Sequence, residues 1–368
     1  MLPFRIPYSG TVGAGEEIAL RFSRILEDGT ASLRGRVVGI AVLLVGFNLL
    51  AWVWACVAFR SHPLLMGTAL LAYSFGLRHA VDADHIAAID NVTRKLMQEG
   101  KRPVAVGLFF SLGHSTIVVA LSVALAATTS ALQERFDDFK TLGGLIGTSV
   151  SAFFLFAIAA ANIFILLATW RTFKSIKGGG RLVESDLNAM LAGGGLLCRL
   201  FRRLFQLIER SWQMYALGLL FGLGFETATE VGLLGISASG AANGLSPWSI
   251  MVFPALFSAG MALIDTADGI LMLGAYGWAF VKPLRRLYYN LTITFVSVLA
   301  ALIVGGLETL GLLADQLRLD GPFWDFIGLI NENFGLLGYG IIAVFAFGWL
   351  ASLVIYRVKR YDEIELLT

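Results

Sequence analysis

Four short stretches of this chain combine ionisable side chains with long apolar runs. The first stretch holds His79, Asp82, Asp84 and His85, at the end of an apolar run that begins near Leu64. Imidazole and carboxylate are ordinary ligands of divalent transition metals, and a carboxylate can also orient a ligating histidine. Because an ionisable group inside a hydrocarbon layer is costly, it indicates function by default. This stretch therefore predicts a metal site.

The other three stretches carry the same kinds of donor. The candidates are His114 in the third apolar run, Glu226, Thr227 and Glu230 in the fifth, and Asp265 and Asp268 in the sixth. At about 1.5 Å per helical residue, His114 and Glu226 lie near the middle of a bilayer. Neutral imidazole with carboxylate and no thiolate fits Ni²⁺, Co²⁺, Zn²⁺ or Mn²⁺ better than Cu(I), and membrane histidines argue against Mg²⁺ or Ca²⁺. We expect a site for a divalent transition metal.

Helix geometry limits how the first stretch can meet one ion. At about 100° per residue, His79 and Asp82 fall in one sector of a straight helix, whereas Asp84 points well away from His79. One regular helix therefore cannot direct His79, Asp84 and His85 at a single ion. Two alternatives stay open. The helix is broken here, as transporter helices are where backbone lines a cavity, or Asp84 acts indirectly.

The composition predicts the elements that position these donors. The chain has 368 residues, of which 57% are hydrophobic and 15% charged, whereas soluble domains carry about a quarter charged residues. Apolar stretches of about 20 residues recur along its whole length. We predict an all-α polytopic membrane protein with one membrane domain. Its eight transmembrane helices lie at 37–59, 64–90, 104–128, 145–170, 212–237, 250–278, 288–314 and 335–356.

The basic residues predict the orientation of these spans. The two tails (1–36 and 357–368) and the even-numbered loops together hold 23 Lys and Arg residues, and the odd-numbered loops hold four. Cytoplasmic loops carry the excess of Lys and Arg. Both termini are therefore predicted to be cytoplasmic. Since the N-terminal tail lacks the features of a signal peptide, we expect the first spanning helix to direct insertion.

The longest loop, 171–211, separates helices 1–4 (37–170) from helices 5–8 (212–356). Its stretch from Cys198 to Arg210 is basic and places its apolar residues on one helical face. An interfacial helix on the anionic inner leaflet is the simpler interpretation, and a partner-docking helix is the alternative. Cys198 and the second cysteine, Cys56, lie far apart and form no CxxC, which predicts neither a thiolate site nor a disulfide.

The four motifs resemble the signatures of the nickel/cobalt transporter family. They read RHAVDADHI at 78–86, LGHS at 112–115, LGFETATE at 223–230 and GMALIDTADG at 260–269. The resemblance implies an eight-helix secondary permease that imports Ni²⁺ or Co²⁺ across the cytoplasmic membrane. It also implies that His79, Asp84 and His85 are required and that the other motif residues contribute. The chain departs from the usual motif at Glu226, where the family has Asp.

Several alternatives and absences bound this expectation. The chain contains no P-loop, so we expect transport to be driven by the membrane potential or a proton gradient, with the metal as substrate and no cofactor, enzyme activity or nucleic-acid partner. An intramembrane metallopeptidase would need His-Glu-x-x-His, which is absent. Metal export, a proton-coupled carrier of another solute, and an inverted repeat relating spans two and three to spans five and six stay open. So do the oligomeric state and the choice between nickel and cobalt.

Overall fold

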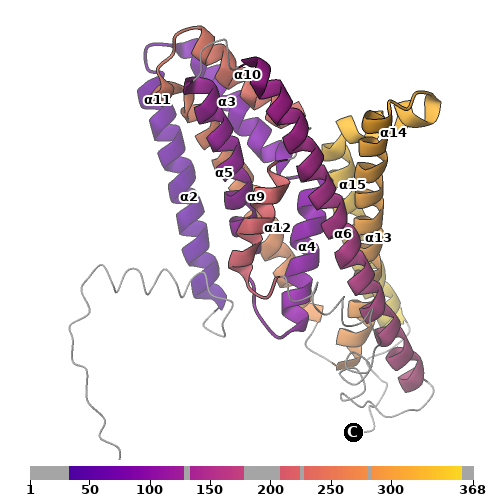
Figure 1. The fold of residues 1–368 in the computed structure, drawn as a ribbon. Helices are drawn as coiled ribbons and strands as arrows, with labels where there is room; N and C mark the ends of the chain where they lie inside the picture. The colour runs from indigo at the N-terminus through magenta and orange to yellow at the C-terminus, as the bar shows by residue number, and fades with distance from the viewer. Residues whose placement is uncertain (1–32, 128–132, 178–207, 224–227, 280–282, 359–368) are drawn as a thin grey trace, which may run out of the picture.

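The computed structural model describes residues 33–127, 133–177, 208–223, 228–279 and 283–358 (Figure 1). Within these ranges every regular element is a helix, which confirms the predicted all-α class. The helices form an elongated bundle. In Figure 1, α2 lies at one edge, and α6 and α13 lie toward the opposite edge. α12 runs between them and packs against α2, α3, α4 and α5.

The described helices have the following bounds. They are α2 (Leu33–Ala58), α3 (Pro63–His79), α4 (Ala83–Gln98), α5 (Val106–Ala127), α6 (Gln133–Lys177), the 3₁₀ turn Ser211–Gln213, α9 (Met214–Phe221), α10 (Ala228–Ala242), α11 (Pro247–Ile250), α12 (Val252–Ala279), α13 (Pro283–Leu317), α14 (Pro322–Glu332) and α15 (Phe334–Val358). Each predicted span overlaps at least one of them. α6 extends beyond its predicted span at both ends.

Length and composition qualify four of the described helices as membrane spans. These spans are Leu33–Ala58, Val106–Ala124, Pro247–Ala275 and Thr294–Leu317, and the number rises to six if each of two bent helix pairs is one span. α2 exposes large apolar side chains such as Val42 and Leu50, as a helix facing lipid does. The chain is thus a polytopic membrane protein by its helices, and eight spans with cytoplasmic termini stay a prediction.

Some predicted features lie outside the described residues. Most of both tails, Cys198 and most of the predicted interfacial helix fall in the ranges 1–32, 178–207 and 359–368. Two candidate ligands, Glu226 and Thr227, fall in 224–227. Cys56 is described and is a free, exposed residue of α2.

The second predicted span is broken, in agreement with one of the two alternatives above. α3 and α4 meet at an angle of 51° across Ala80, Val81 and Asp82. Two short turns close the break, because Val81 N donates to the Arg78 carbonyl (3.0 Å) and Asp82 N donates to the His79 carbonyl (2.9 Å). Asp82 is extended and occupies the N-cap position of α4, but its side chain makes no capping hydrogen bond and contacts His79 instead.

Two glycines bring the helices that carry the donors against α12. A Cβ on Gly76 of α3 would overlap the carbonyl oxygen of Phe257, and one on Gly107 of α5 would overlap that of Asp265. Only glycine permits so close an approach of two helix backbones. The region around His79 and the backbone of Asp265 are therefore held by direct helix-to-helix contact.

One helix was not predicted. α14 lies between the seventh and eighth predicted spans and meets α15 at an angle of 76° across the single residue Asn333. A sequence signal for its start exists, because Gly321 has φ of 124° and Pro322 occupies the first turn. Glycine tolerates this backbone conformation, and proline is favoured at the first helical position.

Candidate metal site

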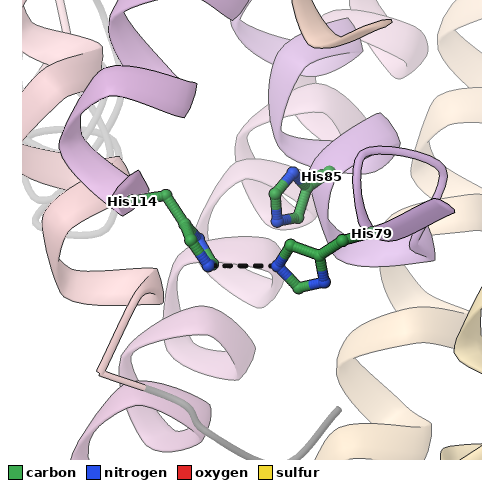
Figure 2. Close-up of side chains that lie close together, drawn as sticks. All are labelled: His79, His85 and His114. Carbon is green, nitrogen blue, oxygen red and sulfur yellow. Dashed lines mark hydrogen bonds between the residues drawn. The ribbon is translucent and has the colours of Figure 1, made fainter. Parts of the chain in front are cut away.

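Three histidines from three helices meet in the interior of the bundle. His79 ends α3, His85 lies in the first turn of α4, and His114 lies in α5. Their ring centroids are 4.7 to 4.9 Å apart, and one nitrogen from each ring lies within 4.8 Å of the other two. Figure 2 shows the rings of His79 and His114 facing one another, with His85 beside them. The break between α3 and α4 is what allows His79 and His85 to face each other.

Each histidine contacts a buried carboxylate. His79 Nδ1 lies 2.9 Å from Asp82 Oδ2, and His85 Nδ1 lies 3.2 Å from Asp265 Oδ1. His114 Nε2 lies 2.8 Å from Glu230 Oε1, which is also 3.6 Å from His79 Nε2. All three carboxylates are at most 3% exposed. Buried charges of this kind are tolerated where they are paired or where they hold a metal.

The pairing decides which ring nitrogens carry a proton and which keep a lone pair. A carboxylate only accepts hydrogen bonds, so His79 and His85 donate their Nδ1–H groups to Asp82 and Asp265 and keep a lone pair on Nε2. His85 Nε2 is buried and has no hydrogen-bond partner among the described residues. A carboxylate behind a ligating histidine fixes the tautomer and raises the basicity of the ring. Both histidines are thus arranged as metal ligands are.

The spacing of two nitrogens fits one ion. His79 Nε2 and His114 Nε2 are 3.0 Å apart (dashed in Figure 2). Two nitrogens bound to one metal at 2.0–2.1 Å and at right angles lie about 2.9 Å apart. Glu230 Oε1 adds an oxygen on the same side. By the same rule as above, His114 Nε2 donates its proton to Glu230, so the arrangement can supply nitrogen and oxygen ligands to one ion once that proton has left His114 Nε2.

The structure does not bring every candidate into this cluster. Asp84 follows the break directly, and its Oδ1 is buried without a hydrogen-bond partner among the described residues. Asp268 lies one turn beyond Asp265 on α12, and its Oδ2 is likewise buried without a hydrogen-bond partner among the described residues. A further buried carboxylate of α4, Asp90, was not a candidate and accepts a hydrogen bond from Ser297 Oγ of α13 (2.6 Å).

Three further residues touch the histidines. Thr229 Oγ1 lies 3.3 Å from His79 Nδ1, and the rings of Phe110 and Phe257 pack against His85 and His79 at 4.8 and 5.5 Å. Phe110 lies one turn before His114, so helical spacing was the only sequence signal for it. The two phenyl rings give the cluster an apolar wall.

The fold defines a polytopic helical membrane protein with histidines and carboxylates gathered in its interior. The chain belongs to the NicO family of high-affinity nickel-transport proteins, whose pattern matches residues 65–355. The resemblance inferred from the four motifs is thereby confirmed. The family and its named members are transport proteins and not enzymes.

Relatives of known name agree with this assignment. The chain is 58% identical over 337 residues to the "High-affinity nickel transport protein" of Cupriavidus necator, covering 92% of this chain and 96% of the other. It is 52% identical to the "Hydrogenase nickel incorporation protein HupN" of Bradyrhizobium diazoefficiens, over 89% and 86% of the two chains. It is 41% identical to the "Cobalt transport protein NhlF" of Rhodococcus rhodochrous, over 80% and 84%. No solved structure is significantly similar to the chain.

Proposed function

We propose that this protein imports Ni²⁺, Co²⁺ or both across the cytoplasmic membrane as a secondary transporter, with the ion passing through the histidine cluster. The observation that carries the proposal is the buried set of three imidazoles backed by three carboxylates. The names of the relatives, which include nickel and cobalt transporters, support the choice of ion. The metal is the substrate and not a resident cofactor.

The chemistry of the donors supports a late first-row divalent ion. The proposed ligands are the Nε2 atoms of His79 and His85 together with Glu230, and His114 Nε2 joins them once the proton that it donates to Glu230 (2.8 Å) has left it. Nickel and cobalt bind imidazole more tightly than manganese does, and the carboxylates offset the charge of the ion in a medium that solvates it poorly. We also propose that Asp84, Asp268, Glu226 and Thr227 contribute to the path of the ion, while Asp82 and Asp265 orient two of the ligands.

The membrane arrangement of the proposal has eight spans and cytoplasmic termini. In it, α3 with α4 forms the second span, α9 with α10 forms the fifth and α15 forms the eighth. The distribution of 23 basic residues against four supports this orientation. Broken spans near mid-depth are the usual position of ion sites in secondary transporters, which agrees with a cluster at the α3–α4 break.

The membrane potential is a sufficient source of energy. A doubly charged ion that moves inward through a potential of about 100 mV gains roughly 4–5 kcal/mol, which corresponds to more than thousandfold accumulation. Purified protein in potassium-loaded vesicles free of ATP should therefore take up radiolabelled Ni²⁺ once valinomycin makes the interior negative. Uptake that requires ATP instead would contradict the secondary mechanism.

A single substitution tests the proposed path of the ion. His79→Ala removes the histidine that contacts both Asp82 and His114, and we expect Ni²⁺ uptake by cells at low micromolar concentration to fall more than a hundredfold. His62→Ala is the matched control, because His62 is the remaining histidine of the chain and is exposed at the start of α3. If both variants transport Ni²⁺ like the unchanged protein, the histidine cluster is not the site.

A further inference from the structure

The start of α15 lies against the α3–α4 break, where His79 and Asp82 are found. A Cβ on Gly338 would overlap the carbonyl oxygen of Val81, the middle residue of the break, and would come within 3.2 Å of Ile86 Cδ1. α15 packs along α4, and Val81 and Ile86 belong to the same apolar cluster as Phe334 and Ile341 of α15. Two backbones are therefore in direct contact where α3 turns into α4.

One turn earlier, α15 also meets the carboxylate that holds His79. A Cβ on Gly335 would lie 3.3 Å from Asp82 Oδ1 and 3.5 Å from Arg78 Nε. The other oxygen of the same carboxylate, Oδ2, is 2.9 Å from His79 Nδ1. Asp82 thus lies between α15 and His79. Its Oδ1 faces α15, and its Oδ2 faces His79.

We infer that Gly335 and Gly338 are positioning residues for the ion site, because they let α15 press on the α3–α4 break and hold Asp82 against His79. This inference rests on the proposed function and extends it to a helix that contributes no ligand of its own. Residues that support a metal-ligating histidine from behind change metal affinity by about 10–100-fold when they are altered. A methyl group at Gly338 must move either α15 or the break.

The test is the affinity of the purified, folded protein for Ni²⁺ in detergent, measured by calorimetry. We expect Gly338→Ala to weaken binding at least tenfold. Gly340→Ala is the matched control, since it lies on the same helix with nothing within 4 Å of its added Cβ, and its affinity should stay within twofold. Gly335→Ala should fall between the two, because its Cβ is close to the carboxylate without overlapping it.

A double-variant cycle separates positioning from a general loss of packing. In an Asp82→Asn background the contact of residue 82 with His79 is already weakened. Gly338→Ala should therefore lower the Ni²⁺ affinity by less than a further twofold. The visible absorption of bound Co²⁺, which reports ligand geometry, should change in Gly338→Ala and not in Gly340→Ala. Should Gly338→Ala fail to fold, Gly335→Ala with its own Asp82→Asn cycle decides the question.

The outcomes are distinguishable from a failure of the proposed function. If His79→Ala abolishes Ni²⁺ binding while Gly338→Ala binds like Gly340→Ala, the ion site stands and the role of α15 is overturned. Equal losses from Gly338→Ala with and without Asp82→Asn would also overturn it. If His79→Ala binds Ni²⁺ normally, the histidine cluster itself is wrong.

Discussion

The part of the chain that the structure describes contains two sharply bent helix pairs, and they differ in the residues that lie at the bend. The α3–α4 pair bends by 51° and leaves His79 and Asp82 at the break, both at most 3% exposed. The α14–α15 pair bends by 76° and leaves its carboxylates, Asp325 and Glu332, exposed. A bend alone therefore does not create an ion site.

The difference lies in the neighbours that each bend meets. The α3–α4 break is enclosed by α5, α10 and α12, which supply His114, Glu230 and Asp265. The α14–α15 bend meets α13, and the beginning of α15 supplies glycines to the other break. At the first bend, donor side chains of α3 and α4 meet donors from three other helices. At the second bend, the glycines of α15 allow one backbone to approach another. Substitutions at each bend should therefore affect different properties.

The largest contrast should come from two carboxylate changes, one in α12 beside the α3–α4 break and one in α14 of the second bent pair. Asp265→Asn removes the charge behind His85, and we expect Ni²⁺ affinity in detergent to fall about 10–100-fold. Asp325→Asn changes an exposed carboxylate in the first turn of α14 and should leave the affinity within twofold. If the two substitutions lowered the Ni²⁺ affinity equally, the two bent pairs would not differ in their role at the ion site.

A smaller effect should follow from the threonine beside His79. Thr229→Val keeps the shape of the side chain and removes the oxygen that lies 3.3 Å from His79 Nδ1. Because Asp82 still holds the same nitrogen at 2.9 Å, we expect the KM for Ni²⁺ uptake to rise two- to fivefold with little change in maximal rate. Thr229→Ser restores the hydroxyl and should restore the KM. A serine variant as impaired as the valine variant would assign the effect to packing.

The bend at α3–α4 was accessible from sequence because it follows from counting angles. His79, Asp84 and His85 cannot face one ion from a straight helix, and this conflict between chemistry and geometry left two alternatives, a broken helix or an indirect role for Asp84. The motifs also identified His114, Glu230 and Asp265 as candidates. Which carboxylate would pair with which histidine depends on helix packing around α12, and no periodicity within one segment reports that.

The bend at α14–α15 was missed for the opposite reason. The polar residues Asn331, Glu332 and Asn333 stand at the bend, but they resemble an ordinary loop between two spans, and only Gly321 and Pro322 mark the start of α14. Gly335 and Gly338 look like ordinary glycines of a membrane helix in the sequence. Their importance depends on Val81 and Asp82, more than 250 residues away, and becomes visible only from the contact between two backbones.

The smallest effect is expected where α14 is anchored to α13. Asn331 Nδ2 donates a hydrogen bond to the Leu307 carbonyl (3.1 Å), and a Cβ on Gly311 would collide with the same amide. Asn331→Ala should reduce stability by about 1 kcal/mol, the usual net value of one hydrogen bond, and lower the unfolding temperature in detergent slightly. Ni²⁺ affinity should stay within twofold, since the bond lies away from the histidines. Asn243→Ala, which removes an exposed amide that bonds the Ser239 carbonyl from just beyond the end of α10, is the control, and it should cost less stability than Asn331→Ala. A loss of Ni²⁺ affinity in Asn331→Ala would mean that the second bend controls the site through α14 as well as through the glycines of α15.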